Sequence, residues 1–208
     1  MGRLAITSET LTTAVAGTLE WDSKVPYFTP LGTQRGVVPG QQFYRLDSAL
    51  AGANVNTAQS LFGVGVTLSS STVYYFDCIF ALNKTSGSTA HTIALGFGGT
   101  ATVNNISYTN LGRLTTSSGL AGITAPDVYN FIQTTTSTVV TASSGANAAV
   151  QYIGRLSGSI SVNVGGTLIP QYTLSAAPGG AYSTQPGSYF LIYPISASGS
   201  NTSVGTWA

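Results

Sequence analysis

The stretch that decides the fold is Thr72-Val-Tyr-Tyr-Phe-Asp-Cys-Ile-Phe-Ala-Leu-Asn83. Apolar side chains occupy every even position from Tyr74 to Leu82, and the odd positions are apolar too, apart from Asp77 and the last residue. Aromatic and β-branched residues at this density predict a strand. Because both faces of the strand are apolar, we expect both to be covered, the second by a neighbouring subunit.

Similar segments continue along the chain, separated by turns rich in Gly, Ser and Asn. We expect residues 72–83 and 91–97 to form one long hairpin. We expect a second hairpin between 159–164 and 167–174, with Gly165-Gly166 supplying a turn of positive φ. Further strands are predicted at 100–110, 129–140, 149–156 and 188–195. Short strands at this spacing, with almost no helical periodicity, predict an all-β fold, a jelly-roll-like antiparallel sandwich.

The first 47 residues differ from the rest. They contain short apolar segments at 17–22, 25–30 and 32–38, interrupted by Pro26, Pro30 and Pro39. Proline has no N–H to donate to a sheet, so these segments cannot be regular central strands. We therefore predict two parts: an extended N-terminal arm or short stalk at 1–47, which is stable only against other copies or a partner, and a β-sandwich head at 48–208.

Charged residues are scarce. The 208 residues include 7 Lys or Arg and 6 Asp or Glu, or 6% charged, and 8 of these residues precede position 48. An average domain has about 25% charged residues. Together with a mean hydropathy of +0.25, this indicates that part of the surface is covered by other copies or by a larger assembly.

The same counts bear on partners and location. A net charge of +1 provides no electrostatic footprint for nucleic acid. No apolar run is long enough for membrane insertion. The first residues lack the apolar core of a signal peptide, so we expect synthesis in a cytosol.

Residues with catalytic or metal-binding chemistry are isolated from one another. His91 is the sole histidine and Cys78 the sole cysteine. A usual zinc or iron site needs several such ligands, so we expect no metal, and a buried, inert thiol. Residues 96–101 match the loosest dinucleotide fingerprint, but no helix is predicted after them, so we expect no cofactor.

The carboxylates are interpreted as structural. Glu20 and Asp22 share one strand face, and we expect them to pair with Lys24 or Arg35 of the same or another subunit. Acid–base work or binding of a hard cation is the alternative for such a pair.

Asp77 interrupts an apolar strand. A buried carboxylate must be paired, and Arg113 or Arg155 is the expected partner. No residue is assigned a catalytic role, and we expect a protein that is not an enzyme.

Three regions resemble known proteins. Gly17-Thr-Leu-Glu-Trp-Asp-Ser-Lys-Val-Pro-Tyr-Phe-Thr-Pro30, followed by Arg-Gly-Val-Val at 35–38, resembles a segment common in tail-fibre and other virion proteins of tailed bacteriophages. Residues 74–102 and 170–194 resemble the heads of such fibres. The chain departs from the pattern at 23–24, where a glycine turn is usual, and it lacks a long shaft. Both features favour a short fibre, a spike or a capsid decoration protein.

The resemblance implies a homotrimer whose arm binds other capsid or tail proteins of the virion. The arm residues expected to anchor and trimerise are Trp21, Tyr27, Phe28 and Arg35. The protein would be assembled in the bacterial cytoplasm and located in the virion.

Our interpretation is a structural virion protein whose head attaches to a host-surface glycan or protein. Tyr108, Tyr152 and Tyr182 lie in or near predicted turns, and we expect them to line a receptor-contact surface. Half-buried tyrosines of a sandwich are the ordinary alternative. The runner-up function is a capsid cement or decoration protein that stabilises the shell. A polysaccharide-degrading tailspike would need paired acids in a groove, and the 6 acids form no compact cluster.

Overall fold

The computed structural model describes residues 5–11, 13–115 and 129–207. These residues form strands, turns and loops, and none of them lies in a helix. The paired strands are antiparallel. The prediction of an all-β antiparallel fold is therefore confirmed.

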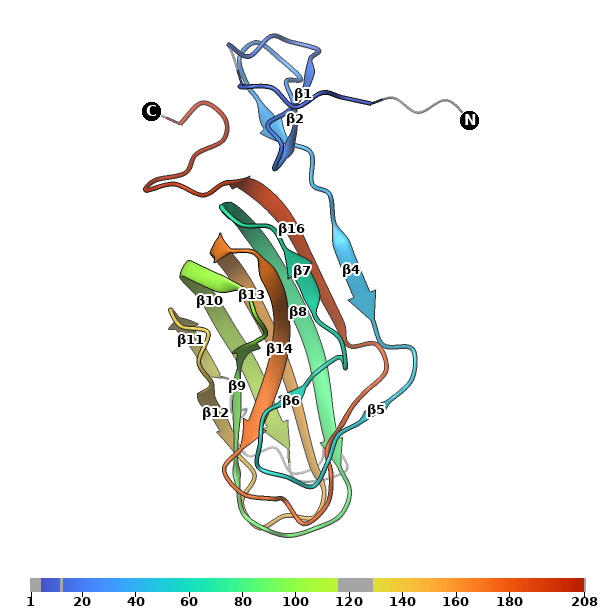
Figure 1. Ribbon diagram of the computed structural model, residues 1–208. Helices are drawn as coiled ribbons and strands as arrows, with labels where there is room; N and C mark the ends of the chain where they lie inside the picture. Colours follow the sequence, from blue (N-terminus) through green and yellow to red (C-terminus); the bar gives the residue numbers. More distant parts are fainter. Residues whose placement is uncertain (1–4, 12, 116–128, 208) are drawn as a thin grey trace.

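The head is a sandwich of two sheets (Figure 1). The larger, 8-stranded sheet contains, in spatial order, β11 (Tyr129–Gln133), β10 (Thr102–Thr115), β13 (Val150–Val164), β8 (Thr72–Lys84), β16 (Tyr189–Ala197) and β4 (Gln42–Arg45). Its short strands β15 (Ser183–Thr184) and β5 (Leu50–Ala51) lie beside the far end of β8. The 5-stranded sheet contains β12 (Val139–Ser143), β9 (Thr92–Gly98), β14 (Gly166–Leu174), β6 (Gln59–Ser60) and β7 (Val66–Leu68).

The pairing of the long strands is nested. Strand β8 pairs with the last long strand, β16; β9 pairs with β14, which precedes β16 among the long strands; and β10 pairs with β13. The chain thus behaves as one long hairpin that is rolled over a common core, which is the arrangement of a jelly roll. The structure is accordingly jelly-roll-like, as the sequence predicted.

The even positions of β8 form the centre of the core. Phe76, Cys78, Phe80 and Leu82 have no accessible surface. The ring of Phe76 meets aromatic rings from both sheets, with centroid distances of 5.3 Å to Phe97, 6.1 Å to Tyr108 and 6.0 Å to Phe190. Cys78 is buried, as predicted, and burial raises the pKa of its thiol. The inertness of the thiol stays a prediction.

The odd positions of β8 face outward and are partly covered by their own sheet. Val73, Tyr75, Ile79 and Ala81 are half-buried. Side chains of adjacent strands supply this cover, as where the ring of Tyr193 lies 5.5 Å from that of Tyr75. Cover of this face by a neighbouring subunit stays a prediction.

Both predicted hairpins are wrong. Strands β8 and β9 belong to different sheets, and so do β13 and β14. The connection between β13 and β14 crosses from one sheet to the other, and neither Gly165 nor Gly166 has a positive φ. These glycines are instead required by close approach, because a Cβ on Gly165 would lie 2.8 Å from the carbonyl oxygen of Leu68.

Other strands differ from the predicted segments in extent. The segment predicted at 129–140 is divided between β11 and β12, whereas 149–156 and 159–164 form the single strand β13. Pro170 lies in the interior of β14. It occupies the gap between the residues that pair with β7 and those that pair with β6, so no N–H is needed on that side.

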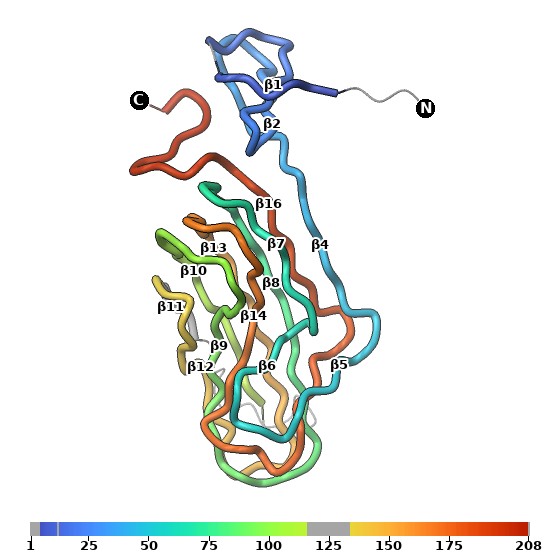
Figure 2. Tube along the Cα trace, viewed as in Figure 1, coloured from blue at the N-terminus to red at the C-terminus, as the bar shows by residue number. Residues whose placement is uncertain are grey.

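The N-terminal part forms a small sheet above the head (Figure 2). It consists of β1 (Leu19–Trp21), β2 (Pro26–Phe28) and β3 (Gly36–Val37). Lys24 Nζ donates a hydrogen bond to the Ser70 carbonyl of the head at 3.1 Å. The sequence assigned residues 42–45 to the arm, but they form β4, which pairs with β16 of the head.

Candidate interaction surfaces

The inner face of the N-terminal sheet is polar and internally hydrogen-bonded. The Arg35 guanidinium donates two hydrogen bonds of 2.8 Å to the Glu20 carboxylate. The predicted pairing of this carboxylate therefore forms within one chain. The Tyr27 hydroxyl donates to Asp22 at 3.0 Å. Burial and the neighbouring Asp22 carboxylate raise the pKa of Tyr27, which therefore stays protonated as a donor. This face lies across a cavity of about 330 Å³ from C-terminal residues 202–205.

The outer face of the same sheet is apolar. Leu19, Trp21 and Phe28 alternate with the inward residues and are 44%, 36% and 42% exposed. A small sheet usually turns its apolar face inward and its polar face to water. Here the order is reversed. We call Leu19, Trp21, Pro26 and Phe28 the N-terminal apolar face.

The four predicted anchoring residues separate onto the two faces of this sheet. Trp21 and Phe28 belong to the N-terminal apolar face. Tyr27 is 3% exposed, and Arg35 is engaged by Glu20. The prediction that all four residues contact a partner is corrected for Tyr27, since a side chain without accessible surface makes no intersubunit contact.

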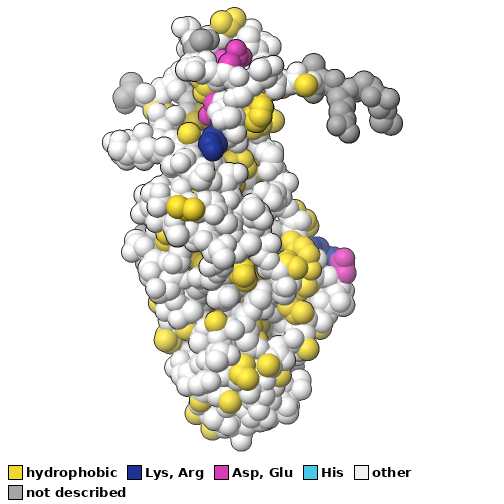
Figure 3. Space-filling view, viewed as in Figure 1, with side chains coloured by type: hydrophobic (Ala, Val, Ile, Leu, Met, Phe, Trp, Pro, Cys, Tyr) yellow, Lys and Arg dark blue, Asp and Glu magenta, His cyan; other side chains and the backbone are white. Residues whose placement is uncertain are grey.

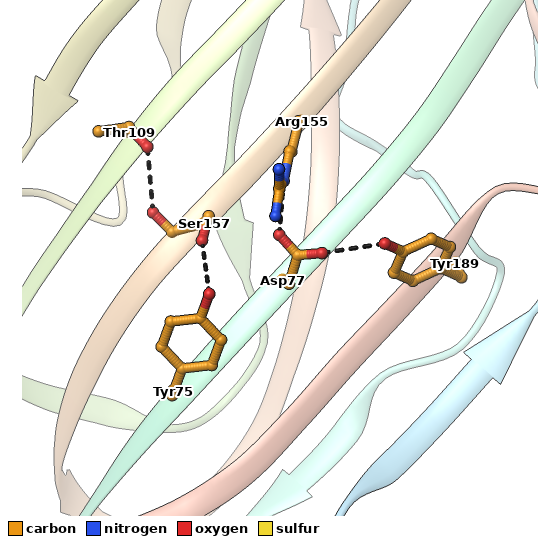
Figure 4. Close-up of polar contacts among 6 residues, drawn as sticks. All are labelled: Tyr75, Asp77, Thr109, Arg155, Ser157 and Tyr189. Carbon is orange, nitrogen blue, oxygen red and sulfur yellow. Dashed lines mark hydrogen bonds and ion pairs between the residues drawn. The ribbon is translucent and has the colours of Figure 1, made fainter.

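The exterior of the 8-stranded sheet carries a polar network across four strands (Figure 4). Arg155 Nε on β13 donates to Asp77 Oδ1 on β8 at 2.8 Å. The Tyr189 hydroxyl on β16 donates to the other carboxylate oxygen at 3.0 Å. Ser157 lies 2.9 Å from the Tyr75 hydroxyl, and its carbonyl oxygen accepts a bond from Thr109 on β10. Of the two predicted partners for Asp77, the structure selects Arg155.

Beside this network lies a shallow, open depression of about 280 Å³. Strand register explains its lining: Arg113 stands opposite Ile153, and Leu111 stands opposite Arg155, so apolar and cationic side chains alternate across β10 and β13. Its lining residues are Ile79, Leu111, Gly112, Arg113, Ile153, Gly154 and Arg155. The Asp77 carboxylate raises the pKa of Arg155, which is therefore a permanent cation.

A third surface feature is a groove of about 260 Å³ at the open edge of the sandwich, between β4 and β7. Phe43, Tyr44 and Val64 are exposed along it. Figure 3 shows hydrophobic side chains gathered beside β4 and over the N-terminal part, on a face with few charged side chains.

His91 lies in a buried cluster at the end of the head. Its Nδ1 donates to the Thr89 carbonyl at 2.7 Å, so Nε2 accepts from the Tyr182 hydroxyl at 2.8 Å. Ser144 Oγ lies 3.1 Å from Nδ1. Burial, with a smaller effect of the Lys84 charge, lowers the pKa of His91. The imidazole is therefore a neutral, hydrogen-bonded core residue.

The three tyrosines predicted to contact a receptor lie in the core. Tyr108, Tyr152 and Tyr182 are 2%, 0% and 0% exposed. The prediction is wrong because Tyr108 and Tyr152 lie on the inward faces of β10 and β13, and Tyr182 lies in a loop that packs on the core. Gly112 shows the close packing, since a Cβ there would lie 2.0 Å from the Tyr152 hydroxyl.

The segment that matched the loose dinucleotide fingerprint connects two strands, β9 and β10. No N-terminus of a helix follows it to hold a pyrophosphate. Within the described ranges, no three His, Cys, Asp or Glu residues lie close enough to hold a metal ion. The described residues also include no helix that is long and apolar enough to cross a membrane.

Comparisons with known proteins identify no family for this chain. No family model matches the chain, and no curated protein matches it. Among solved structures, it is similar to a chain in the structure of infectious bursal disease virus Gx strain, with a TM-score of 0.21 and 8% sequence identity. The similarity covers 79% of this chain and 42% of the viral chain. A TM-score this low supports no conclusion about function.

Proposed function

We propose that this protein is a non-enzymatic structural component of a tailed-phage virion, a short fibre-like or spike-like homotrimer. The N-terminal sheet joins the copies and anchors them to other virion proteins, and the jelly-roll-like head is presented outward. The sequence resemblance at 17–38 supports the assignment to phage virions.

The observation that carries the proposal is the reversed N-terminal sheet. Its ion pair and hydrogen bonds are turned inward, while Trp21 and Phe28 are turned to solvent. Burying a large apolar side chain contributes about 1.5–3 kcal/mol. With roughly two-fifths of each residue still exposed, covering both would contribute about 1–2 kcal/mol per protomer. Association itself costs about 4–15 kcal/mol, so this face is one contribution to an interface that must include further contacts between the copies.

A capsid cement or decoration protein is the second candidate, because the same apolar face would suit attachment to shell subunits. The two functions differ in location. A decoration protein covers the capsid lattice in many copies, whereas a fibre or spike occurs in a few copies at a vertex or on the tail. Imaging of labelled protein on the particle separates them.

The assembly is tested by native mass measurement of the full chain. We expect a trimer for the wild type and a monomer for the double variant Trp21→Ser/Phe28→Ser. Val164→Ser is the matched control, because Val164 is 54% exposed but lies on the head, and it should leave the trimer intact. A wild-type chain that stays monomeric at micromolar concentrations refutes the assembly.

A further inference from the structure

We infer that the exterior of β10, β13 and β8 binds a carboxylate-bearing saccharide, held over the depression between Arg113 and Arg155. The inference rests on the proposed function, since it names the ligand class for an outward-facing head. It depends on three features of the described residues: an excess of positive charge, an oriented guanidinium, and a surface that combines apolar groups with hydroxyls.

The first feature is charge. On the exterior of β10, β13, β8 and β16, the described charged residues are Arg113, Arg155 and Asp77. The two arginines border one depression, whose lining is almost wholly apolar and includes their hydrocarbon stems, and Asp77 lies near Arg155 with only 10% of its side chain exposed. One positive charge is therefore in excess on a head that carries few other charges. A partner of opposite charge complements it.

The second feature is the orientation of Arg155. Arg155 Nε donates to one carboxylate oxygen of Asp77, and the Tyr189 hydroxyl donates to the other. These two bonds orient the guanidinium. Its terminal nitrogens make no hydrogen bond to the described residues, and 52% of its side chain is exposed. A guanidinium held in this way presents two parallel donors to a planar carboxylate. Because it is already ordered, less entropy is lost on binding.

The third feature is the composition around the two cations. Leu111 and Ile153 are exposed at the depression, and the adjacent row of the sheet carries the hydroxyls of Thr109, Ser157 and Tyr75. An acidic sugar offers the complementary groups: a carboxylate, apolar C–H patches and several hydroxyls. The open depression of about 280 Å³ is shallower than an enclosed small-molecule site, which suits one unit of an exposed polysaccharide.

An acidic peptide fits this surface less well. Extended peptides commonly bind by adding a strand to a free sheet edge, where backbone groups are available. Strands β13 and β8 are each paired on both sides. The depression lies in the middle of the sheet, so it offers side chains but no unpaired backbone.

The test is calorimetric titration of the full chain with four probes: trigalacturonate, sialyllactose, a hyaluronan tetrasaccharide and hexaglutamate. The methyl ester of each saccharide is the matched neutral ligand. The variants are Arg113→Gln in the depression and Arg45→Gln on β4, where Arg45 pairs with Asp47 away from the depression. Melting of both variants is recorded to establish that they fold.

We expect at least one acidic saccharide to bind and its methyl ester to bind at least tenfold more weakly. Loss of one charge-assisted hydrogen bond in Arg113→Gln should weaken binding about tenfold or more, with little change for Arg45→Gln. Three results overturn the inference: no binding by any of the saccharides, equal losses in the two variants, or tighter binding of hexaglutamate.

The mass of the same samples separates this inference from the proposed assembly. A trimer that binds no saccharide refutes the saccharide site and supports the proposed assembly. A monomer that binds an acidic saccharide refutes the proposed assembly and supports the saccharide site.

Discussion

Replacing Asp77 with Asn tests whether the exterior network stabilises the head. The carboxylate accepts from Arg155 at 2.8 Å and from Tyr189 at 3.0 Å. An amide of the same size keeps one acceptor oxygen for Arg155 and can donate to the Tyr189 hydroxyl, but it carries no charge, so the bond to Arg155 loses its charge assistance. A hydrogen bond to a charged group is worth about 1.5–3 kcal/mol when buried. Exposed ion pairs contribute about 0.2–1 kcal/mol.

The two exposures decide between these ranges. The Asp77 side chain is 10% exposed and that of Arg155 is 52% exposed. Water can therefore replace part of the interaction that the Arg155 guanidinium loses in the variant. We therefore expect Asp77→Asn to lower the free energy of unfolding by about 1 kcal/mol. For a chain of this length, that corresponds to a melting temperature about 2–4 °C lower.

The assay is thermal melting by circular dichroism, combined with a double-mutant cycle of Asp77→Asn and Arg155→Gln. A coupling energy of about 0.5–1.5 kcal/mol is expected for a shared hydrogen bond. Asp47→Asn is the control, because the Asp47 side chain is 84% exposed and pairs with Arg45, and its effect should stay within about 0.5 kcal/mol. A zero coupling energy, or equal effects of the two Asn variants, would refute the reasoning.

Two further predictions concern the core. Burial lowers the pKa of His91 below its usual 6.5, so below that pH the unfolded chain binds more protons, and stability should fall as the pH is lowered from 7. Urea unfolding across this range should show a smaller decline in His91→Gln; an identical pH slope would contradict the assignment. A Cβ in Gly158→Ala would lie 2.2 Å from the Ser107 carbonyl oxygen, so we expect a loss of about 1–3 kcal/mol. Gly40→Ala, with open space around it, should melt like the wild type, and equal melting of both variants would show that the strands adapt without cost.

Alternation within one strand was readable from the sequence because it is a local property. The period of two from Tyr74 to Leu82 identified the core face of β8, and the oddity of Asp77 in that strand pointed to an ion pair with one of two arginines. Choosing Arg155 over Arg113 required the register of β13 against β8, which places Arg155 opposite Ile79 and next to the carboxylate. No feature near either arginine in the sequence encodes that register.

The burial of the tyrosines could not be predicted from the alternation within their own strands. Tyr108 and Tyr152 have amphipathic side chains that suit either a surface or a core, and both lie in predicted strands close to predicted turns. Their burial follows from the opposite sheet packing over them. The signal that could have located the core was the placement of Gly112 and Gly154, whose missing side chains make room for the rings of Tyr152 and Phe80.

The sequence by itself determined that this protein is built from strands, that its head is nearly free of charge, and that the first 47 residues differ from the rest. These properties follow from composition and from a two-residue period, which need no partner strand. Only the tertiary structure decided which long strands pair, since β8, β9 and β10 enter the two sheets alternately and pair with β16, β14 and β13, which lie far along the chain. The tertiary structure also decided that the apolar side of the N-terminal sheet faces solvent. The ion pair of Glu20 and Arg35 lies on the inner face of this sheet, so the apolar side chains lie on the outer face.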